Sequence, residues 1–121
     1  MAISFFSISL DCDDAGKLAS FWSEALGRPV DGGATDEFAA IGLEGEAGPG
    51  PAWMFHKVPE AKVAKNRVHA DFLSPGLNSE VERILTLGAT HIRDVEEGGY
   101  RWATLADPEG NEFDVVAAPG S

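Results

Sequence analysis

The sequence predicts an α+β fold made of two βαβββ modules, which form a curved, mostly antiparallel sheet around a cleft with the helices outside. Two observations predict it. Alternating apolar and polar residues, typical of a strand, precede an apolar helical stripe in each half of the 121-residue chain. Both helical stripes end in the same dipeptide, Leu26-Gly27 and Leu87-Gly88, half a chain length apart. This spacing indicates an internal duplication.

The first half begins with alternating residues over 3–11, which predict a half-buried strand. Asp13 and Asp14 are good helix N-caps, and Gly27 is a typical helix terminator. Between them, one apolar stripe predicts a helix, and it contains Leu18, Phe21, Trp22, Ala25 and Leu26. Three short β-rich segments follow, at 28–31, 37–43 and 52–57.

The second half repeats this order of elements. Residues 67–73 alternate, and a Ser-Pro-Gly break then leads to Asn78 or Ser79 as the expected helix cap. The stripe of Leu77, Val81, Ile84 and Leu85 predicts the helix, which Gly88 ends. Strands are expected at 90–94, 100–105 and 111–116. Each half therefore reads as β-α-β-β-β.

Turn-forming residues mark the connections between these elements. The Gly/Pro-rich stretch 46–51 and the turn at 107–111 join the last two strands of the two halves, and the polar stretch 59–66 links the halves. We expect a single domain over 1–121, with module one at about 1–58 and module two at about 67–121. A chain this short has too little apolar surface for two independent cores.

Composition excludes several classes of function. The net charge of −11 repels phosphate backbones and anionic lipids, so we expect neither nucleic-acid nor membrane binding. No apolar run approaches the length of a membrane-spanning helix, and the N-terminal residues do not resemble a secretory signal. Cys12 has no second cysteine to pair with. These features predict a soluble, cytoplasmic protein.

The two-module pattern resembles the vicinal-oxygen-chelate superfamily, which includes glyoxalase I, extradiol dioxygenases, methylmalonyl-CoA epimerases and the fosfomycin and bleomycin resistance proteins. The resemblance covers nearly the whole chain and is carried by the segments LASFWSEALG (18–27), KNRVHAD (65–71), LGAT (87–90) and LADPEGNEF (105–113). These segments look most like the small glyoxalase-like proteins of bacteria. The resemblance implies a small-molecule ligand and a homodimer, and this fold carries several unrelated chemistries.

The resemblance also implies where a metal would be bound, because metal-using members take ligands from the first and last strands of both modules. Module two offers His69 and Asp114 at these places. Module one offers His56, which aligns with Asp114 if Phe55 matches Phe113, and only Ser7 on its first strand. Two histidines and a carboxylate suit a divalent Zn, Ni, Mn or Fe ion. Glu112, which shares the parity of Asp114, is the candidate general base.

Structural roles are equally open for several of these residues. His69 can hydrogen-bond Asp114 without a metal, His56 can be an exposed strand-end residue, and His91 is expected at the surface. Asp71 can pair with a positive side chain or contact a substrate. Trp53 and Trp102 are expected to pack under the helices. Ser7, Ser9 and Met54 are the expected ligand contacts.

Two function classes remain on these grounds. The first is a metal-dependent lyase, isomerase or dioxygenase-type enzyme that acts on a small oxygenated substrate, motivated by His56, His69 and Asp114. The second is a metal-free protein that binds a small molecule or sequesters an antibiotic, motivated by Ser7 at a ligand place. Both predict a glyoxalase-like, small-molecule-binding protein.

Overall fold

The computed structural model describes residues 3–44 and 50–119. The chain divides into two compact units, Met1–Ala61 and Lys62–Ser121. The division falls within the polar stretch 59–66, which the amino-acid pattern predicts as the linker. Most of the Gly/Pro-rich stretch 46–51 lies outside the described residues.

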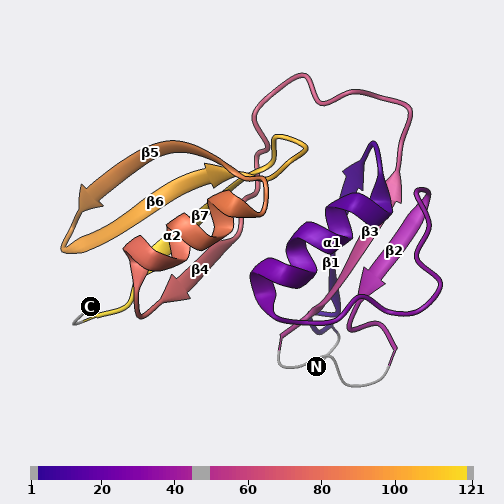
Figure 1. Ribbon diagram of the computed structural model, residues 1–121, viewed down its shortest axis with the longest axis horizontal. Coiled ribbons are helices and arrows are strands. Elements are labelled where there is room, and N and C mark those ends of the chain that lie inside the picture. The colour runs from indigo at the N-terminus through magenta and orange to yellow at the C-terminus, as the bar shows by residue number, and fades with distance from the viewer. Residues whose placement is uncertain (1–2, 45–49, 120–121) are drawn as a thin grey trace. The chain divides into compact units, whose positions relative to one another are not determined.

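The first unit is a three-stranded sheet with one helix (Figure 1). Its elements are β1 (Ser7–Cys12), α1 (Ala15–Leu26), β2 (Phe38–Ile41) and β3 (Ala52–Lys57). The strand order is β1-β3-β2, with β1 parallel to β3 and β2 antiparallel to it. An isolated antiparallel bridge between Val30 and Ile41 adds one residue pair beyond β2.

The second unit is a four-stranded sheet with one helix (Figure 1). Its elements are β4 (Asp71–Ser74), α2 (Leu77–Thr86), β5 (Thr90–Glu97), β6 (Tyr100–Ala106) and β7 (Glu112–Ala117). The order is β4-β7-β6-β5, with β4 parallel to β7 and the other two pairs antiparallel.

This topology confirms the α+β class and the repeated module. In each unit the first strand runs parallel to the last, and every other strand pair is antiparallel. The Val30 bridge occupies the place that β5 occupies in the second unit, so the first unit keeps only a remnant of its fourth strand. Among the described residues, no helix is long and apolar enough to cross a membrane.

Helix α1 forms where the capping residues predict it. Asp14 accepts a hydrogen bond from the Lys17 backbone N–H, and Gly27 ends the helix in the left-handed conformation with φ of 68°. The buried side of the helix packs on the sheet through Trp22, whose ring centroid lies 4.9 Å from that of Trp53. Phe55 is fully buried beside Trp53. Trp53 therefore packs under the helix, as predicted.

The core of the second unit lies between α2 and one face of its sheet. Leu77 and Ile84 are the buried residues of α2. On the face of the sheet toward α2, the two central strands bury Ala103 and Leu105 of β6 and Phe113 and Val115 of β7. The intervening residues, which include Trp102, Thr104 and Asp114, belong to the opposite face of the sheet because side chains alternate along a strand. The prediction that Trp102 packs under a helix is therefore wrong.

Three other local predictions differ from the structure. The first strand begins at Ser7 rather than residue 3, because its partner β3 begins opposite it at Ala52. The N-cap of α2 is Gly76, which offers no side-chain cap, and Ser79 instead donates its hydroxyl to the Gly76 carbonyl. The predicted strand at 28–31 is reduced to the Val30 bridge.

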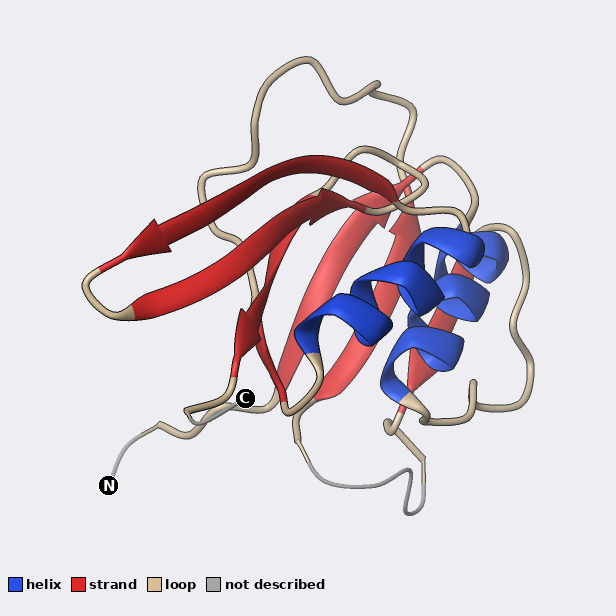
Figure 2. Cartoon of the chain, turned by 60° about the vertical axis from the view of Figure 1, so that its left-hand side comes forward, coloured by secondary structure: helices blue, strands red, loops and turns tan. Residues whose placement is uncertain are grey.

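Strands β5 and β6 form a long hairpin whose tip extends past α2 (Figures 1 and 2). The register shifts between His91 and Arg93, which is the mark of a β-bulge. After the shift, Arg93 pairs with Thr104 and Asp94 with Ala103. The bulge therefore places Arg93 on the same face of the sheet as Thr104 and Asp114.

Candidate functional site

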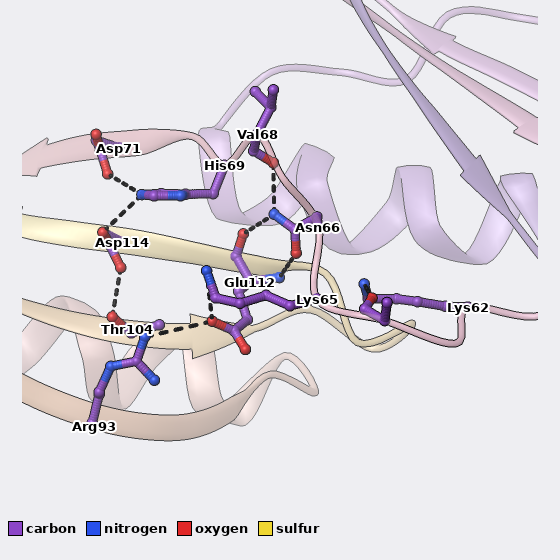
Figure 3. A network of polar contacts seen from close by, with 11 residues as sticks. Lys62, Lys65, Asn66, Val68, His69, Asp71, Arg93, Thr104, Glu112 and Asp114 are labelled. Carbon is purple, nitrogen blue, oxygen red and sulfur yellow. Dashed lines mark hydrogen bonds and ion pairs between the residues drawn. The ribbon is translucent and has the colours of Figure 1, made fainter.

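Two of the three predicted metal ligands, His69 and Asp114, meet Asp71 at the start of β4 and the middle of β7. The Nε2 atom of His69 lies 3.2 Å from Asp114 Oδ2 and 3.3 Å from Asp71 Oδ1 (Figure 3). One donor atom from each residue falls within 4.8 Å of the others. The side chain of Asp114 is 14% exposed, whereas those of His69 and Asp71 are open to solvent. The group is therefore anchored at Asp114 and accessible from one side.

The pairing register explains why the two carboxylates meet. Asp71 lies directly opposite Asp114 across the parallel β4–β7 pair, so both side chains leave the same face of the sheet. Thr104, on the other side of Asp114, donates its hydroxyl to Asp114 Oδ1 at 2.6 Å. This bond fixes the orientation of the carboxylate and leaves Oδ2 directed toward His69.

Asn66 holds the segment that carries His69 against β7 (Figure 3). Its side-chain Oδ1 accepts the Glu112 backbone N–H at 3.0 Å, and its Nδ2 donates to the Glu112 carbonyl at 3.4 Å. The same Nδ2 donates to the Val68 carbonyl at 2.6 Å. Asn66 thus replaces a backbone partner of β7, and the main-chain ladder resumes where Asp114 donates its N–H to the Ala70 carbonyl.

Glu112 lies two residues before Asp114 on β7, so the two side chains share one face of the sheet. The Oε1 atom of Glu112 is buried and accepts no hydrogen bond within the described part of the chain. Lys65 Nζ and Arg93 Nη2 approach this oxygen at 3.9 and 3.7 Å, which are ion-pair distances too long for hydrogen bonds (Figure 3). The Glu112 carboxylate therefore contacts two cationic side chains through long ion pairs.

The proximity of the two aspartates affects the ionisation of one of them. Partial burial raises the pKa of Asp71, and its hydrogen bond with Asp114 raises it further, against the opposing effect of His69. Two carboxylates on one site resist simultaneous ionisation because their charges repel. The group therefore carries negative charge that the neighbouring side chains do not fully balance.

The first unit has counterparts of these residues, with a different chemistry. Asp11 lies opposite His56 in the β1–β3 pair, as Asp71 lies opposite Asp114. Ser9, and not Ser7 as predicted, then takes the place of His69, two residues before the first-strand aspartate, because Asp11 is the residue that pairs with His56. Phe38 lies opposite His56 where Thr104 lies opposite Asp114, and its ring packs 5.2 Å from the imidazole. The first unit thus has a serine where the second unit has a histidine.

The remaining predicted site residues lie in the first unit. Ser7 pairs with Ala52, and Ser9 pairs with Met54, on the face of the sheet that also carries His56. Met54 and His56 are partly exposed. His91 is exposed, as predicted, and contacts Asp94 at 2.9 Å.

Sequence reasoning did not single out Lys65, Asn66, Arg93 and Thr104 as parts of the site. Lys65 and Asn66 lie in the predicted linker, and Arg93 reaches the site face only because of the bulge. Thr104 could have been found from the sequence, because β6 and β7 form a regular hairpin around the predicted turn 107–111. Counting back from this turn places Thr104 opposite Asp114.

The donor set of His69, Asp71 and Asp114 fits a divalent first-row metal ion. One imidazole nitrogen and two carboxylate oxygens are ligands that Zn, Mn, Fe and Ni accept. Partial burial and the neighbouring Asp114 carboxylate raise the pKa of Asp71, and a bound cation would favour the charged form of both carboxylates. Thr104 supplies the hydrogen bond to a ligating carboxylate that metal sites commonly have.

The comparisons with known proteins agree with this architecture. The fosfomycin resistance protein FosX from Listeria monocytogenes matches with a TM-score of 0.75 at 14% identity, over 99% of this chain and 97% of the other. A glyoxalase/bleomycin resistance protein/dioxygenase family enzyme from Burkholderia phytofirmans gives 0.73 at 15% identity, over 92% and 95%. The bleomycin-binding protein of Streptomyces verticillus gives 0.65 at 18% identity, over 98% of both chains.

At these identities the likeness shows the fold alone. No curated protein sequence gives a significant match. The sequence profile of the glyoxalase-like domain matches residues 7–116, which include every strand from β1 to β6 and nearly all of β7. This match shows that the chain belongs to the glyoxalase-like domain family, in agreement with its two βαβββ modules.

Proposed function

We propose that this protein binds a small oxygenated molecule at a divalent cation held by His69, Asp71 and Asp114. The observation that carries the proposal is the meeting of one imidazole nitrogen and two carboxylates within 4.8 Å, on an accessible face of the sheet. Asp114 is already oriented by Thr104, so only the more exposed ligands need to adjust.

Three protein ligands leave positions for water or substrate oxygens. A bound cation would supply Lewis acidity to the oxygens of the substrate. Glu112 would act as the proton acceptor in a lyase, isomerase or dioxygenase-type reaction. Its support is the buried Oε1 without a hydrogen bond, on the same face and two residues from Asp114.

His56 is proposed as a further ligand on the ground of the family resemblance. In the first unit it contacts the Phe38 ring, and Ser7, Ser9 and Met54 share its face of the sheet. We propose that these three residues contact the ligand.

A second candidate is a metal-free protein that binds or sequesters a small molecule. It is favoured by the contacts of His69, which reaches both aspartates and can satisfy them without an ion. The net charge of −11 favours cationic ligands. In this case, compounds would raise the melting temperature of protein kept in a chelator.

We also propose that the chain forms a homodimer, as the family resemblance implies. The support within this chain is the exposure of large apolar side chains at its N-terminal end, where Ile3, Phe5 and Phe6 are 90, 72 and 65% exposed. Sedimentation of the purified protein measures the mass directly.

The test is a calorimetric titration of chelator-treated protein with Zn²⁺ and Mn²⁺. We expect near-stoichiometric binding to the wild type, and a loss of at least about tenfold in affinity for His69→Ala and Asp114→Asn, since each removes a ligand. His91→Ala is the matched control, because His91 also contacts an aspartate but lies outside the group.

Equal binding by the wild type and His69→Ala would contradict the proposal. A His56→Ala variant tests the first unit separately. Weaker binding by this variant would add His56 to the ligand set, and unchanged binding would limit the set to the second unit.

A further inference from the structure

One row of polar residues crosses all four strands of the second sheet. The register places Asp71 opposite Asp114, Asp114 opposite Thr104, and Thr104 opposite Arg93. Arg93 therefore lies in the same row as the proposed cation ligands, two strands away from Asp114. Its position depends on the bulge in β5.

The next row on the same face is entirely apolar. It contains Leu73, Val116, Trp102 and Val95, which pair with one another across β4, β7, β6 and β5. Leu73 is 69% exposed, and the other three are partly exposed. The face therefore changes from polar to apolar within one step along the strands.

Two cationic side chains lie on the polar side of this face. Lys65 and Arg93 come from different segments and approach the same oxygen, Glu112 Oε1. Their side chains are 56 and 51% exposed, whereas that of Glu112 is 21% exposed. Both cations are therefore more exposed than the carboxylate, which they reach from two different segments (Figure 3).

By itself, the trio of Lys65, Arg93 and Glu112 has a formal charge of +1, because two positive side chains share one carboxylate. An incoming oxyanion accepts charge-assisted hydrogen bonds of about 2.8 Å on each of its sides. It can contact both cations from the solvent side without displacing Glu112. A neutral group of the same shape would leave the excess charge unbalanced.

From these three features we infer that the ligand is a small monocarboxylate with an apolar body and an oxygen donor next to the carboxylate. The carboxylate contacts Lys65 and Arg93, the oxygen donor lies toward Asp114, and the apolar body covers Trp102 and Leu73. A 2-hydroxycarboxylate with an aromatic substituent represents this class. The inference rests on the proposed cation site for the place of the oxygen donor.

The test uses three probes that differ in one feature each. Phenyllactate has the full set, phenyllactamide lacks the charge, and lactate lacks the apolar body. Calorimetry on Zn²⁺-treated wild-type protein should show phenyllactate binding at least about tenfold more tightly than either of the others, because a charge-assisted bond and an aromatic contact each change affinity by about this factor.

Variants assign each preference to its residues. Lys65→Gln and Arg93→Gln should each reduce the preference for phenyllactate over phenyllactamide toward one, whereas Arg93→Lys should largely keep it. Trp102→Ala should reduce the preference over lactate and leave the charge preference intact. Arg101→Gln is the matched control, because Arg101 lies on β6 next to Trp102 and contacts Asn78 of α2 instead.

Thermal unfolding of each variant shows whether it is folded. If phenyllactamide binds as tightly as phenyllactate, or if no probe binds folded wild-type protein, the inference is overturned.

A titration with Zn²⁺ alone separates this result from the proposed function. Zn²⁺ binding without carboxylate preference would overturn only the ligand class. Carboxylate preference without Zn²⁺ binding would support the ligand class and overturn the cation site.

Discussion

At the scale of single residues, the ionisation of Asp71 depends on opposing effects of its neighbours Asp114 and His69. Asp71 lies opposite Asp114 and reaches His69, and its pKa is raised because partial burial and the second carboxylate both disfavour its charge. Carboxylates with a raised pKa are common in functional sites, and a cation bound as proposed would offset this cost.

The sign of the resulting pH dependence follows from linkage. Because the folded-state pKa of Asp71 lies above that of the unfolded chain, folded protein holds this proton more tightly in the window between the two values. Asp71 therefore lowers stability as the pH rises through that window. At neutral pH, which lies above this window, the free energy of unfolding is therefore lowered by the full effect of the shift.

We therefore expect Asp71→Asn to make the metal-free protein slightly more stable at neutral pH. The gain should be less than about 1 kcal/mol, because the Asp71 side chain is 61% exposed. The gain should shrink in acid, below the unfolded-state pKa. Urea unfolding in a chelator at both pH values measures it.

The same variant should bind Zn²⁺ more weakly, since it loses a ligand. Asp94→Asn, which removes a carboxylate that contacts His91 outside the site, is the control for both measurements. A metal-free Asp71→Asn protein that is less stable than the wild type at neutral pH would contradict this account.

At the scale of secondary-structure elements, Asn66 decides where β4 begins. Its side chain takes the backbone N–H and carbonyl of Glu112, so the chain from 66 to 69 is held at β7 without being a strand. The alternation over 67–73 predicted a longer strand. Alternation reports which side chains are buried, and it does not show whether a backbone or a side chain pairs with the neighbouring strand.

Asn66→Ala should lower the free energy of unfolding by about 2 kcal/mol, because the Glu112 backbone groups lose their partners. It should also weaken Zn²⁺ binding, since the segment that carries His69 is no longer held. Asn78→Ala is the matched control, because Asn78 lies on α2 and accepts a long 3.4 Å hydrogen bond from the Arg101 side chain instead of pairing with a strand. Chemical unfolding and calorimetry measure the two effects.

A purely structural role for Asn66 predicts a different result. In that case, folded Asn66→Ala protein would be less stable but would bind Zn²⁺ with the affinity of the wild type.

The bulge in β5 is a second feature that sequence reasoning missed. Residues 90–94 read as a regular strand, in which Arg93 and His91 would share one face. The register shift puts them on opposite faces of the sheet. The side chain of Arg93 therefore approaches Glu112, whereas that of His91 contacts the Asp94 carboxylate. A bulge adds one residue without a strong composition signal, and its position depends on the partner strand.

At the scale of the whole molecule, the net charge of −11 is the dominant electrostatic feature. Like charges repel one another in the compact state, and salt screens this repulsion. We expect the melting temperature of the metal-free protein to rise by roughly 2–5 °C between low salt and physiological ionic strength.

The wild type and His69→Ala should show the same salt effect, whereas Zn²⁺ at matched ionic strength should stabilise only the wild type. A melting temperature that is unchanged or lowered by salt would contradict the role given to net charge. Equal stabilisation of both proteins by Zn²⁺ would mean that the ion acts outside the proposed site.

The sequence by itself determined the duplicated βαβββ module, the limits of the first helix and the shared strand face of Glu112 and Asp114. These follow from local chemistry: strand and helix periodicities differ, caps are specific, and alternate residues of one strand share a face. Only the tertiary structure decided that Asp71 joins His69, that Asn66 holds their segment, and that Lys65 and Arg93 converge on Glu112. Those contacts depend on strand register, which pairs residues far apart in the chain and is invisible to local periodicity.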